Sequence, residues 1–178
     1  LDHVRLINNI GSAEALRENM RAWPSATHIS AFGMTELSGI ASHTDPNDTP
    51  AQRAETCGKP YEGIEVAIVH PESGHVCTEN EQGEIRVRGF VLFDGYYKQP
   101  EETARVIDDR GWFRTGDLGS LDPEGRIRFH GRIKDVLKVG GENVSPLEVE
   151  AWLSTHPDVM VAQVVGAPDD RLDEVVAA

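Results

Sequence analysis

The first sixty residues carry short apolar runs on either side of an amphipathic segment. Residues 4–8 (VRLIN) and 27–32 (THISAF) predict two buried strands, and residues 13–23 predict a helix that ends before Pro24. A helix between two short apolar strands is typical of an α/β unit. Ligands of such units bind at the carboxyl ends of the strands, where residues 31–39 (AFGMTELSG) follow the second strand.

The pattern changes after residue 61, where apolar and polar residues alternate over short stretches. Strands of this kind, separated by turn-forming residues, favour a small antiparallel sheet or barrel. A helix is expected at 100–107, and the polar Pro/Asp-rich segment 43–53 predicts a loop. The predicted strands are 65–70, 84–89 and 126–131, and the predicted turns are 71–74, 79–83 and 122–125.

The last part of the chain predicts a strand, a tight turn, a helix and a strand. Residues 135–139 (DVLKV) precede the turn GGEN. In the following SPLEVEAWLSTH, Ser145 fits an N-cap, Pro146 the first helical position, and Glu148 a capping box. Residues 159–166 (VMVAQVVG) predict a buried strand.

These patterns place boundaries near residue 60 and at 133–134. The chain starts without Met and stops at DEVVAA, where an apolar strand begins. We therefore expect a piece of a longer protein.

Composition is that of an ordinary globular protein, with 178 residues, 39% hydrophobic and 26% charged. The net charge of -13 argues against a nucleic-acid backbone as the main partner, although a small anionic ligand needs only a few local donors. Cys57 and Cys77 form no CxxC pair, so we expect reduced, packed thiols and no structural metal. No apolar run in the sequence reaches the length of a membrane span, and we expect neither a membrane span nor a signal peptide.

The stretch AFGMTE combines an aromatic ring, a glycine, a hydroxyl and a carboxylate. Phe32 offers a flat apolar face, and Gly33 allows another group to approach the backbone closely. Thr35 and Glu36 add oxygen atoms. The alternative is that Phe32 belongs to the core and Glu36 is a solvated loop acid.

Two later stretches are also dense in polar residues and glycines. In GWFRTGDLG (111–119), Asp117 is expected on a sharp turn, where its carboxylate could accept hydrogen bonds from a diol such as a ribose; a turn acid that caps its own backbone is the alternative. In GRIKDVLKVGGENV (131–144), charged residues precede Gly140 and Gly141, which leave room for a thin ligand or another backbone. A charged linker followed by a hairpin turn is the alternative here.

AFGMTE, GWFRTGDLG and GRIKDVLKVGGENVSPLEVE occur in the order and spacing of the adenylate-forming enzymes, which the chain resembles along nearly its whole length. This superfamily includes acyl-CoA synthetases, firefly luciferase and the adenylation domains of peptide synthetases. The third stretch is similar to that of acyl-CoA synthetases, particularly medium- and long-chain fatty acyl or related carboxylate ligases, and differs from the GRxDxQVKIRGxRIE pattern of peptide synthetases.

The resemblance implies a mixed α/β fold in three parts. Residues 1–60 would be part of the α/β AMP-binding subdomain. Residues 61–133 would form a small antiparallel β-barrel, and residues 134–178 would start an α+β C-terminal lid domain.

The resemblance also implies roles for individual residues. Phe32 would stack on adenine, Thr35 would meet the α-phosphate, and Glu36 would bind Mg²⁺, while Asp117 and Arg132 would hold the ribose hydroxyls. The implied ATP/AMP-binding set is Gly11, Ser12, Ala13, Phe32, Gly33, Met34, Thr35, Asp117, Phe129 and Arg132. The implied catalytic set is Thr35, Glu36, Lys138 and Asn143, with Lys134 as hinge and Gly140 and Gly141 as coenzyme A-binding residues. The chain departs from the pattern at Glu14, where many relatives have Pro.

The implied reaction joins a small carboxylic acid, ATP and coenzyme A through an acyl adenylate, with Mg²⁺. The family's N-terminal phosphate loop and C-terminal adenylation lysine do not occur in this sequence, so we expect the isolated chain to be inactive. A cytoplasmic ligase is expected, and a homo-oligomer is left open. The alternatives are an enzyme that loads a carrier protein, as fatty acyl-AMP ligases do, and a non-catalytic nucleotide-binding module.

Overall fold

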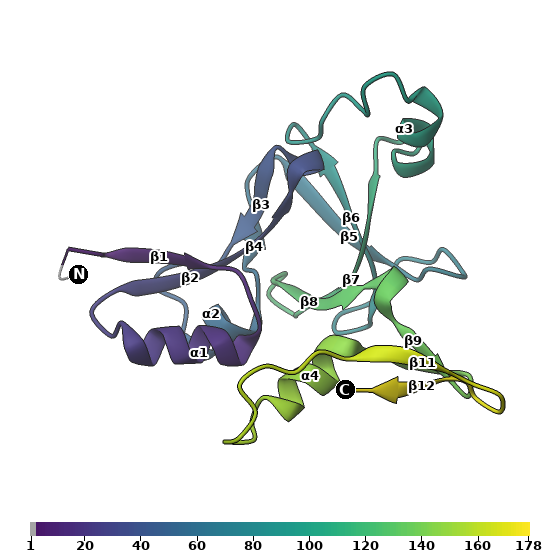
Figure 1. The fold of residues 1–178 in the computed structure, drawn as a ribbon. Helices are drawn as coiled ribbons and strands as arrows, with labels where there is room; N and C mark the ends of the chain where they lie inside the picture. Colours follow the sequence, from purple (N-terminus) through teal and green to yellow (C-terminus); the bar gives the residue numbers. More distant parts are fainter. Residues whose placement is uncertain (1–2) are drawn as a thin grey trace. The chain divides into compact units, whose positions relative to one another are not determined.

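The structure is a computed structural model that describes residues 3–178 and contains two compact units (Figure 1). Unit 1 consists of the described residues through Thr115 together with Gly119–Phe129. Unit 2 consists of Gly116–Leu118 and His130–Ala178. The mixed α/β fold predicted from the sequence is confirmed, since each unit contains both helix and sheet.

The predicted strand–helix–strand unit opens unit 1. Its two strands pair in parallel, with Leu6 opposite Thr27, and the helix between them begins after Ser12, whose side chain accepts a hydrogen bond from the Ala15 backbone at 3.2 Å. The next two strands extend this sheet in the order β1-β2-β3-β4. The elements are β1 Leu6–Asn9, α1 Ala13–Ala22, β2 Thr27–Met34, β3 Gly39–His43 and β4 Lys59–Pro60.

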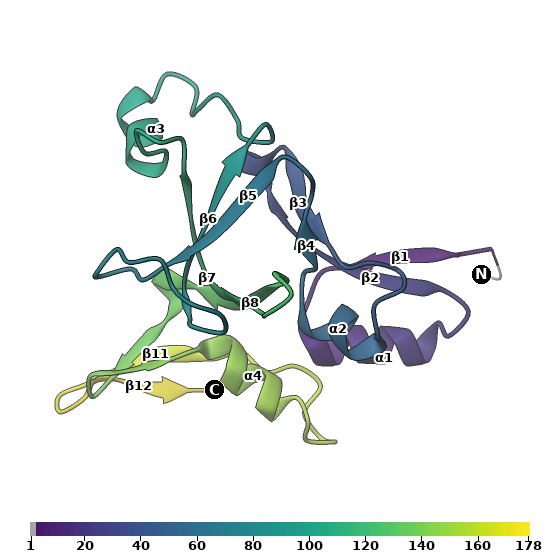
Figure 2. The same cartoon turned by 180° about the vertical axis from the view of Figure 1, so that it is seen from behind.

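A second helix, α2 Pro50–Glu55, lies beside α1 in both views (Figure 1 and Figure 2) and overlaps the end of the segment 43–53 that was expected to be a loop. The expectation was wrong for residues 50–53, because Thr49 and Gln52 form a capping box. The Gln52 backbone donates to the Thr49 hydroxyl at 3.2 Å, and the Thr49 backbone donates to the Gln52 side chain at 2.9 Å. Pro50 at the first helical position needs no hydrogen-bond acceptor, so TPAQ starts a helix.

The second sheet of unit 1 has the order β5-β6-β7-β8. β5 pairs with β6 in antiparallel fashion, with Ile64 opposite Gly89, and the predicted helix at 100–107 is present as α3. The pairing leaves β5 and β8 as the edges of the described sheet, so its closure into a barrel stays a prediction. The elements are β5 Ile64–Val69, β6 Gly83–Gly89, α3 Pro100–Val106, β7 Phe113–Leu121 and β8 Ile127–Arg132.

One hydrophobic core joins the two sheets of unit 1 across the boundary predicted near residue 60. Five of its members are 0% exposed, namely Leu37, Ala41, Ile85, Val87 and Ile127. Cys57 packs against this core as a free thiol, and burial raises its pKa to about 11. The core residues are Phe32, Leu37, Ala41, Ile64, Ile68, Ile85, Val87, Val91, Phe113 and Ile127.

Unit 2 contains a four-stranded sheet of order β10-β9-β12-β11 and one α-helix. Ser145 is the N-cap of that helix, as predicted, but the capping box with Glu148 was wrong. The Ser145 hydroxyl instead donates to the His130 carbonyl oxygen at 3.1 Å. The elements are the short 3-10 helix η2 Ile133–Asp135, β9 Leu137–Val139, β10 Glu142–Val144, α4 Pro146–Leu153, β11 Val165–Asp169 and β12 Asp173–Ala177.

The buried strand predicted at 159–166 was also wrong. β11 begins only at Val165, and Met160 and Val161 are 94% and 79% exposed. The backbone N–H of Val164 donates to the carboxylate of Glu150 at 2.8 Å, so a side chain takes the place of a neighbouring strand. Across residues 3–178, no helix has the length and apolar character required to cross a bilayer.

We predict that Gly58→Ala destabilises the protein more than Gly125→Ala does. Both glycines have left-handed backbones, with φ of 71° and 79°, and this strain costs any L-residue roughly 1–2 kcal/mol. Only at Gly58 would the new Cβ lie 1.8 Å from the His43 carbonyl oxygen, which adds an overpacking cost of about 1–3 kcal/mol. Urea denaturation of the two variants measures the difference, and equal losses would contradict the prediction.

Candidate functional site

The stretch that follows β2 forms a single 3-10 turn, η1 Thr35–Leu37. Leu37 is fully buried in the core of unit 1, while Thr35 is exposed and Glu36 is half-buried. The turn ends at Ser38, whose φ of 52° reverses the chain into β3. Burial of Leu37 therefore fixes the turn and leaves the oxygen atoms of its first two residues near the surface.

The glycine of AFGMTE has a packing reason. A Cβ atom on Gly33 would lie 1.9 Å from the carbonyl oxygen of Gly39, and the β2–β3 register shifts between Phe32 and Gly33. The group that approaches Gly33 closely is thus the backbone of the neighbouring strand. Phe32 is 4% exposed and belongs to the core, which agrees with the alternative stated for this residue. Its stacking on adenine stays a prediction.

Tyr96 holds Glu36 from a position sixty residues along the chain. Its hydroxyl donates to Glu36 Oε1 at 3.0 Å, and the Phe93 backbone N–H donates to the Glu36 carbonyl oxygen at 2.9 Å. The rings of Phe93 and Tyr96 meet edge to face at 4.9 Å. Burial, followed by the bond to the Glu36 carboxylate, raises the pKa of Tyr96, so the phenol keeps its proton and stays a donor.

Asp117 lies in the middle of β7, which corrects the prediction of a sharp turn. Gly116 has a φ of 71°, but the strand continues through it from Phe113 to Leu121 because β7 is hydrogen-bonded to strands on both sides. Within unit 2, the buried Asp117 forms an ion pair with Arg132, with 2.7 Å between Oδ1 and Nε. Asp117 and Arg132, which the resemblance assigned together to the ribose hydroxyls, are therefore in contact.

The glycine-rich stretch forms the β9–β10 hairpin, which agrees with the hairpin-turn alternative for this segment. Gly140 and Gly141 make the turn with φ of 59° and 90°, and Lys138 is directly opposite Asn143. The backbone N–H of Lys138 donates to Glu174 in β12, which fixes the hairpin in the sheet. The hairpin thus presents the two predicted catalytic residues side by side.

The remaining predicted site residues have a range of environments. Gly11 is exposed, and Ser12 uses its hydroxyl to cap α1. Met34 packs against the core of unit 1, Phe129 is 41% exposed within β8, and Lys134 is exposed in η2. Ala13 is the first residue of α1.

Three pairs of predicted residues are therefore brought together. Thr35 and Glu36 share a turn of unit 1, while unit 2 pairs Asp117 with Arg132 and Lys138 with Asn143. The sequence analysis missed Tyr96, because no local pattern connects it with Glu36. It also missed a group of His, Cys and Glu side chains between β5 and β6.

Comparisons with known proteins give a consistent result. The model of a family described as AMP-binding enzyme matches residues 3–97, more than half of the chain. YngI of Bacillus subtilis (strain 168), by name a candidate acyl-CoA synthetase, is 42% identical over 148 residues, which are 83% of this chain and 27% of that protein. The mitochondrial medium-chain acyl-CoA ligase ACSF2 of Macaca fascicularis is 37% identical over 150 residues, 84% of this chain and 24% of the ligase.

A solved structure shares the fold as well. The o-succinylbenzoate CoA synthetase MenE from Bacillus subtilis, in complex with its acyl-adenylate intermediate, matches with a TM-score of 0.83 and 31% identity. The match covers 98% of this chain and 35% of MenE. The chain spans 27% and 24% of the lengths of the two curated relatives named above.

We predict that Asp117 and Arg132 stabilise the fold as a coupled pair. In a double-mutant cycle with Asp117→Asn and Arg132→Gln, the coupling free energy should be about 1–2 kcal/mol, because one partner is buried and charged. Glu14 and Arg21 form the control, an exposed pair joined by one hydrogen bond with the same 2.7 Å separation, and should couple more weakly. Denaturant titration of each variant supplies the free energies. An equal coupling in both pairs would show that burial of Asp117 adds nothing.

Proposed function

Because the chain belongs to the family of AMP-binding, adenylate-forming enzymes, we propose that the intact protein is an acyl-CoA synthetase. It would activate a carboxylic acid with ATP, forming an acyl adenylate and pyrophosphate, and then transfer the acyl group to the thiol of coenzyme A. The observation that carries the proposal is the 42% identity to YngI over 148 residues. The three motifs and the contacts of Glu36 and Asp117 support it.

In the first half-reaction, the Thr35–Glu36 turn would face the phosphates of ATP. The Thr35 hydroxyl would donate to the α-phosphate, and Glu36 would hold Mg²⁺. The two side chains supply only oxygen atoms, the donor type that Mg²⁺ prefers, so the residues present fit this ion. Mg²⁺, when bound, would supply positive charge next to the phosphates. Tyr96 would orient Glu36 through the phenol hydrogen bond.

Asp117 and Arg132 would hold the ribose. A carboxylate can accept hydrogen bonds from two neighbouring hydroxyls, and the ion pair with the Arg132 guanidinium would hold the Asp117 side chain in position. The adenine would lie along Gly11, Ser12, Ala13, Phe32, Gly33, Met34 and Phe129. The protein's contribution is positioning and charge stabilisation of the reacting groups.

For the second half-reaction, we assign the unit 2 hairpin to coenzyme A. Gly140 and Gly141 have no side chains, so a thin pantetheine chain could pass along their backbone. Lys138 and Asn143 would lie beside the reacting centre, and Lys134 would be the hinge at which the lid turns. The subdomain limits 1–60, 61–133 and 134–178 belong to the same proposal.

The substrate proposed is a fatty or related carboxylic acid, in agreement with the third motif and with the name of ACSF2. We place the enzyme in the cytoplasm, although ACSF2 is named as mitochondrial. The test uses the intact protein with ATP, Mg²⁺ and a panel of carboxylic acids. Acid-dependent pyrophosphate exchange together with consumption of coenzyme A is expected. Exchange without coenzyme A consumption would favour a carrier-protein acceptor, and no exchange with any acid would reject the proposed function.

We predict that Glu36→Gln slows adenylation by the intact enzyme at least tenfold at low Mg²⁺ and that excess Mg²⁺ partly restores the rate. The amide keeps the size of the side chain and removes the charge that would attract the ion. Pyrophosphate exchange as a function of Mg²⁺ concentration measures the effect.

Glu62→Gln is the matched control, since it removes the same charge from an exposed position of unit 1 and should leave the Mg²⁺ dependence unchanged. Tyr96→Phe should give a smaller loss than Glu36→Gln, because it removes only the donor. An unchanged Mg²⁺ dependence in Glu36→Gln would remove Glu36 from the proposed metal site.

A further inference from the structure

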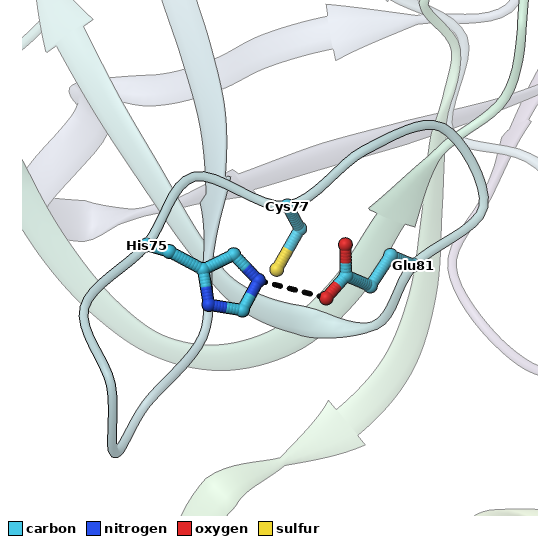
Figure 3. Close-up of side chains that lie close together, drawn as sticks. All are labelled: His75, Cys77 and Glu81. Carbon is cyan, nitrogen blue, oxygen red and sulfur yellow. Dashed lines mark hydrogen bonds and ion pairs between the residues drawn. The ribbon is translucent and has the colours of Figure 1, made fainter.

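The segment between β5 and β6 gathers three different metal-ligating side chains. The donor atoms of His75, Cys77 and Glu81 all lie within 4.8 Å of one another. Figure 3 shows the His75 ring and the Glu81 carboxylate facing each other, with the Cys77 sulfur next to both. All three come from one short loop of unit 1 and have no part in the function proposed above.

The backbone that carries these side chains is fixed by the neighbouring strands. The Cys77 N–H donates to the Ile68 carbonyl oxygen and the Asn80 N–H to that of Leu121, both at 2.8 Å. A Cβ atom on Gly83 would lie 2.9 Å from the Cys77 sulfur, so the absence of a side chain at Gly83 makes the space for the thiol. The loop is thus a built arrangement rather than a free segment.

Each of the three side chains also has a hydrogen-bond partner outside the group, and for Cys77 it is the Gln82 carbonyl oxygen, at 3.7 Å from the sulfur. His75 Nδ1 lies 2.7 Å from the Ser73 hydroxyl, while Nε2 lies 2.8 Å from Glu81 Oε1. The other oxygen, Glu81 Oε2, accepts from the Thr78 backbone at 2.9 Å and from its hydroxyl at 3.2 Å. Metal-binding His and carboxylate ligands typically have such outer partners, which fix the tautomer and the direction of the free lone pair.

We propose that His75, Cys77 and Glu81 bind a borderline-soft divalent ion such as Zn²⁺ through one nitrogen, one sulfur and one oxygen atom. In a tetrahedral zinc site, donor atoms lie roughly 3.3–3.6 Å apart, given metal–ligand distances of about 2.0–2.3 Å. Side-chain rotations would bring the sulfur inward and open the His75–Glu81 contact. Water takes the fourth position, and the Cys77 thiol releases its proton to solvent as the sulfur–metal bond forms.

The donor set selects the kind of ion. A thiolate and an imidazole favour Zn²⁺, Co²⁺ or Ni²⁺, whereas Mg²⁺ prefers oxygen ligands. This site is therefore chemically distinct from the one proposed around Glu36. The bound ion would cross-link the two ends of the loop, because His75 and Cys77 lie on one side of the 78–81 turn and Glu81 closes it.

The experiment titrates the metal-free intact protein with Co²⁺ and, by competition, with Zn²⁺. One equivalent of Co²⁺ should give thiolate-to-metal charge-transfer absorption and the visible bands of a four-coordinate ion, and Zn²⁺ should displace it while excess Mg²⁺ should not. His75→Ala, Cys77→Ser and Glu81→Gln should each weaken binding at least tenfold, since the loss of outer partners alone costs about 10–100-fold. Ser73→Ala should weaken binding on the order of tenfold.

A matched control is present in the same loop. Glu79→Gln removes the same charge as Glu81→Gln from an exposed position and should keep the metal bands. Circular dichroism of each metal-free variant checks that it folds. Charge-transfer absorption that survives in Cys77→Ser, or binding that none of the three ligand variants weakens, would overturn the proposal.

Discussion

The burial of Leu37 is the constraint on which the site of unit 1 depends. Leu37 is 0% exposed and packs in the core that both sheets of unit 1 share. It is also the last residue of the turn that carries Thr35 and Glu36, so their position follows from the packing of one side chain. Truncation of such a residue to Ala typically costs about 2–5 kcal/mol, which shows how strongly the core holds this turn.

The backbone of the AFGMTE stretch was predictable only in part, because Gly33 allows a close contact that the sequence does not reveal. The strand at 27–32 and the polar turn after it follow from the local pattern of hydrophobic residues. The reason for Gly33 is the carbonyl oxygen of Gly39 in the adjacent strand, and this contact depends on how β3 folds back. The sequence of β3, GIASH, has no clear alternation of apolar and polar residues, so it did not predict a strand.

The remaining features were predictable where they depend on neighbouring residues and were missed where they depend on contacts between distant residues. The helix at 13–22 and the hairpin around Gly140 were recognisable, because capping and turn residues lie within the elements themselves. The contact of Tyr96 with Glu36 was not, since it bridges sixty residues through tertiary packing. Spacing could have indicated the group of His75, Cys77 and Glu81, which lie two and four residues apart, but the hairpin that makes their side chains converge is visible only in three dimensions.

The two acids of the candidate site have opposite kinds of partner, and this difference supports their proposed roles. Glu36 accepts a hydrogen bond from Tyr96, a neutral donor, so the full negative charge of its carboxylate remains available to a cation. Asp117 is paired with the cation Arg132, so its charge is already balanced within the protein. A balanced carboxylate suits neutral hydroxyl groups such as those of a ribose, because binding them leaves no uncompensated charge in a buried position. Among the described residues, the side-chain hydrogen-bond partner of Glu36 is the neutral Tyr96. The half-buried carboxylate therefore suits Mg²⁺, whose positive charge would balance it.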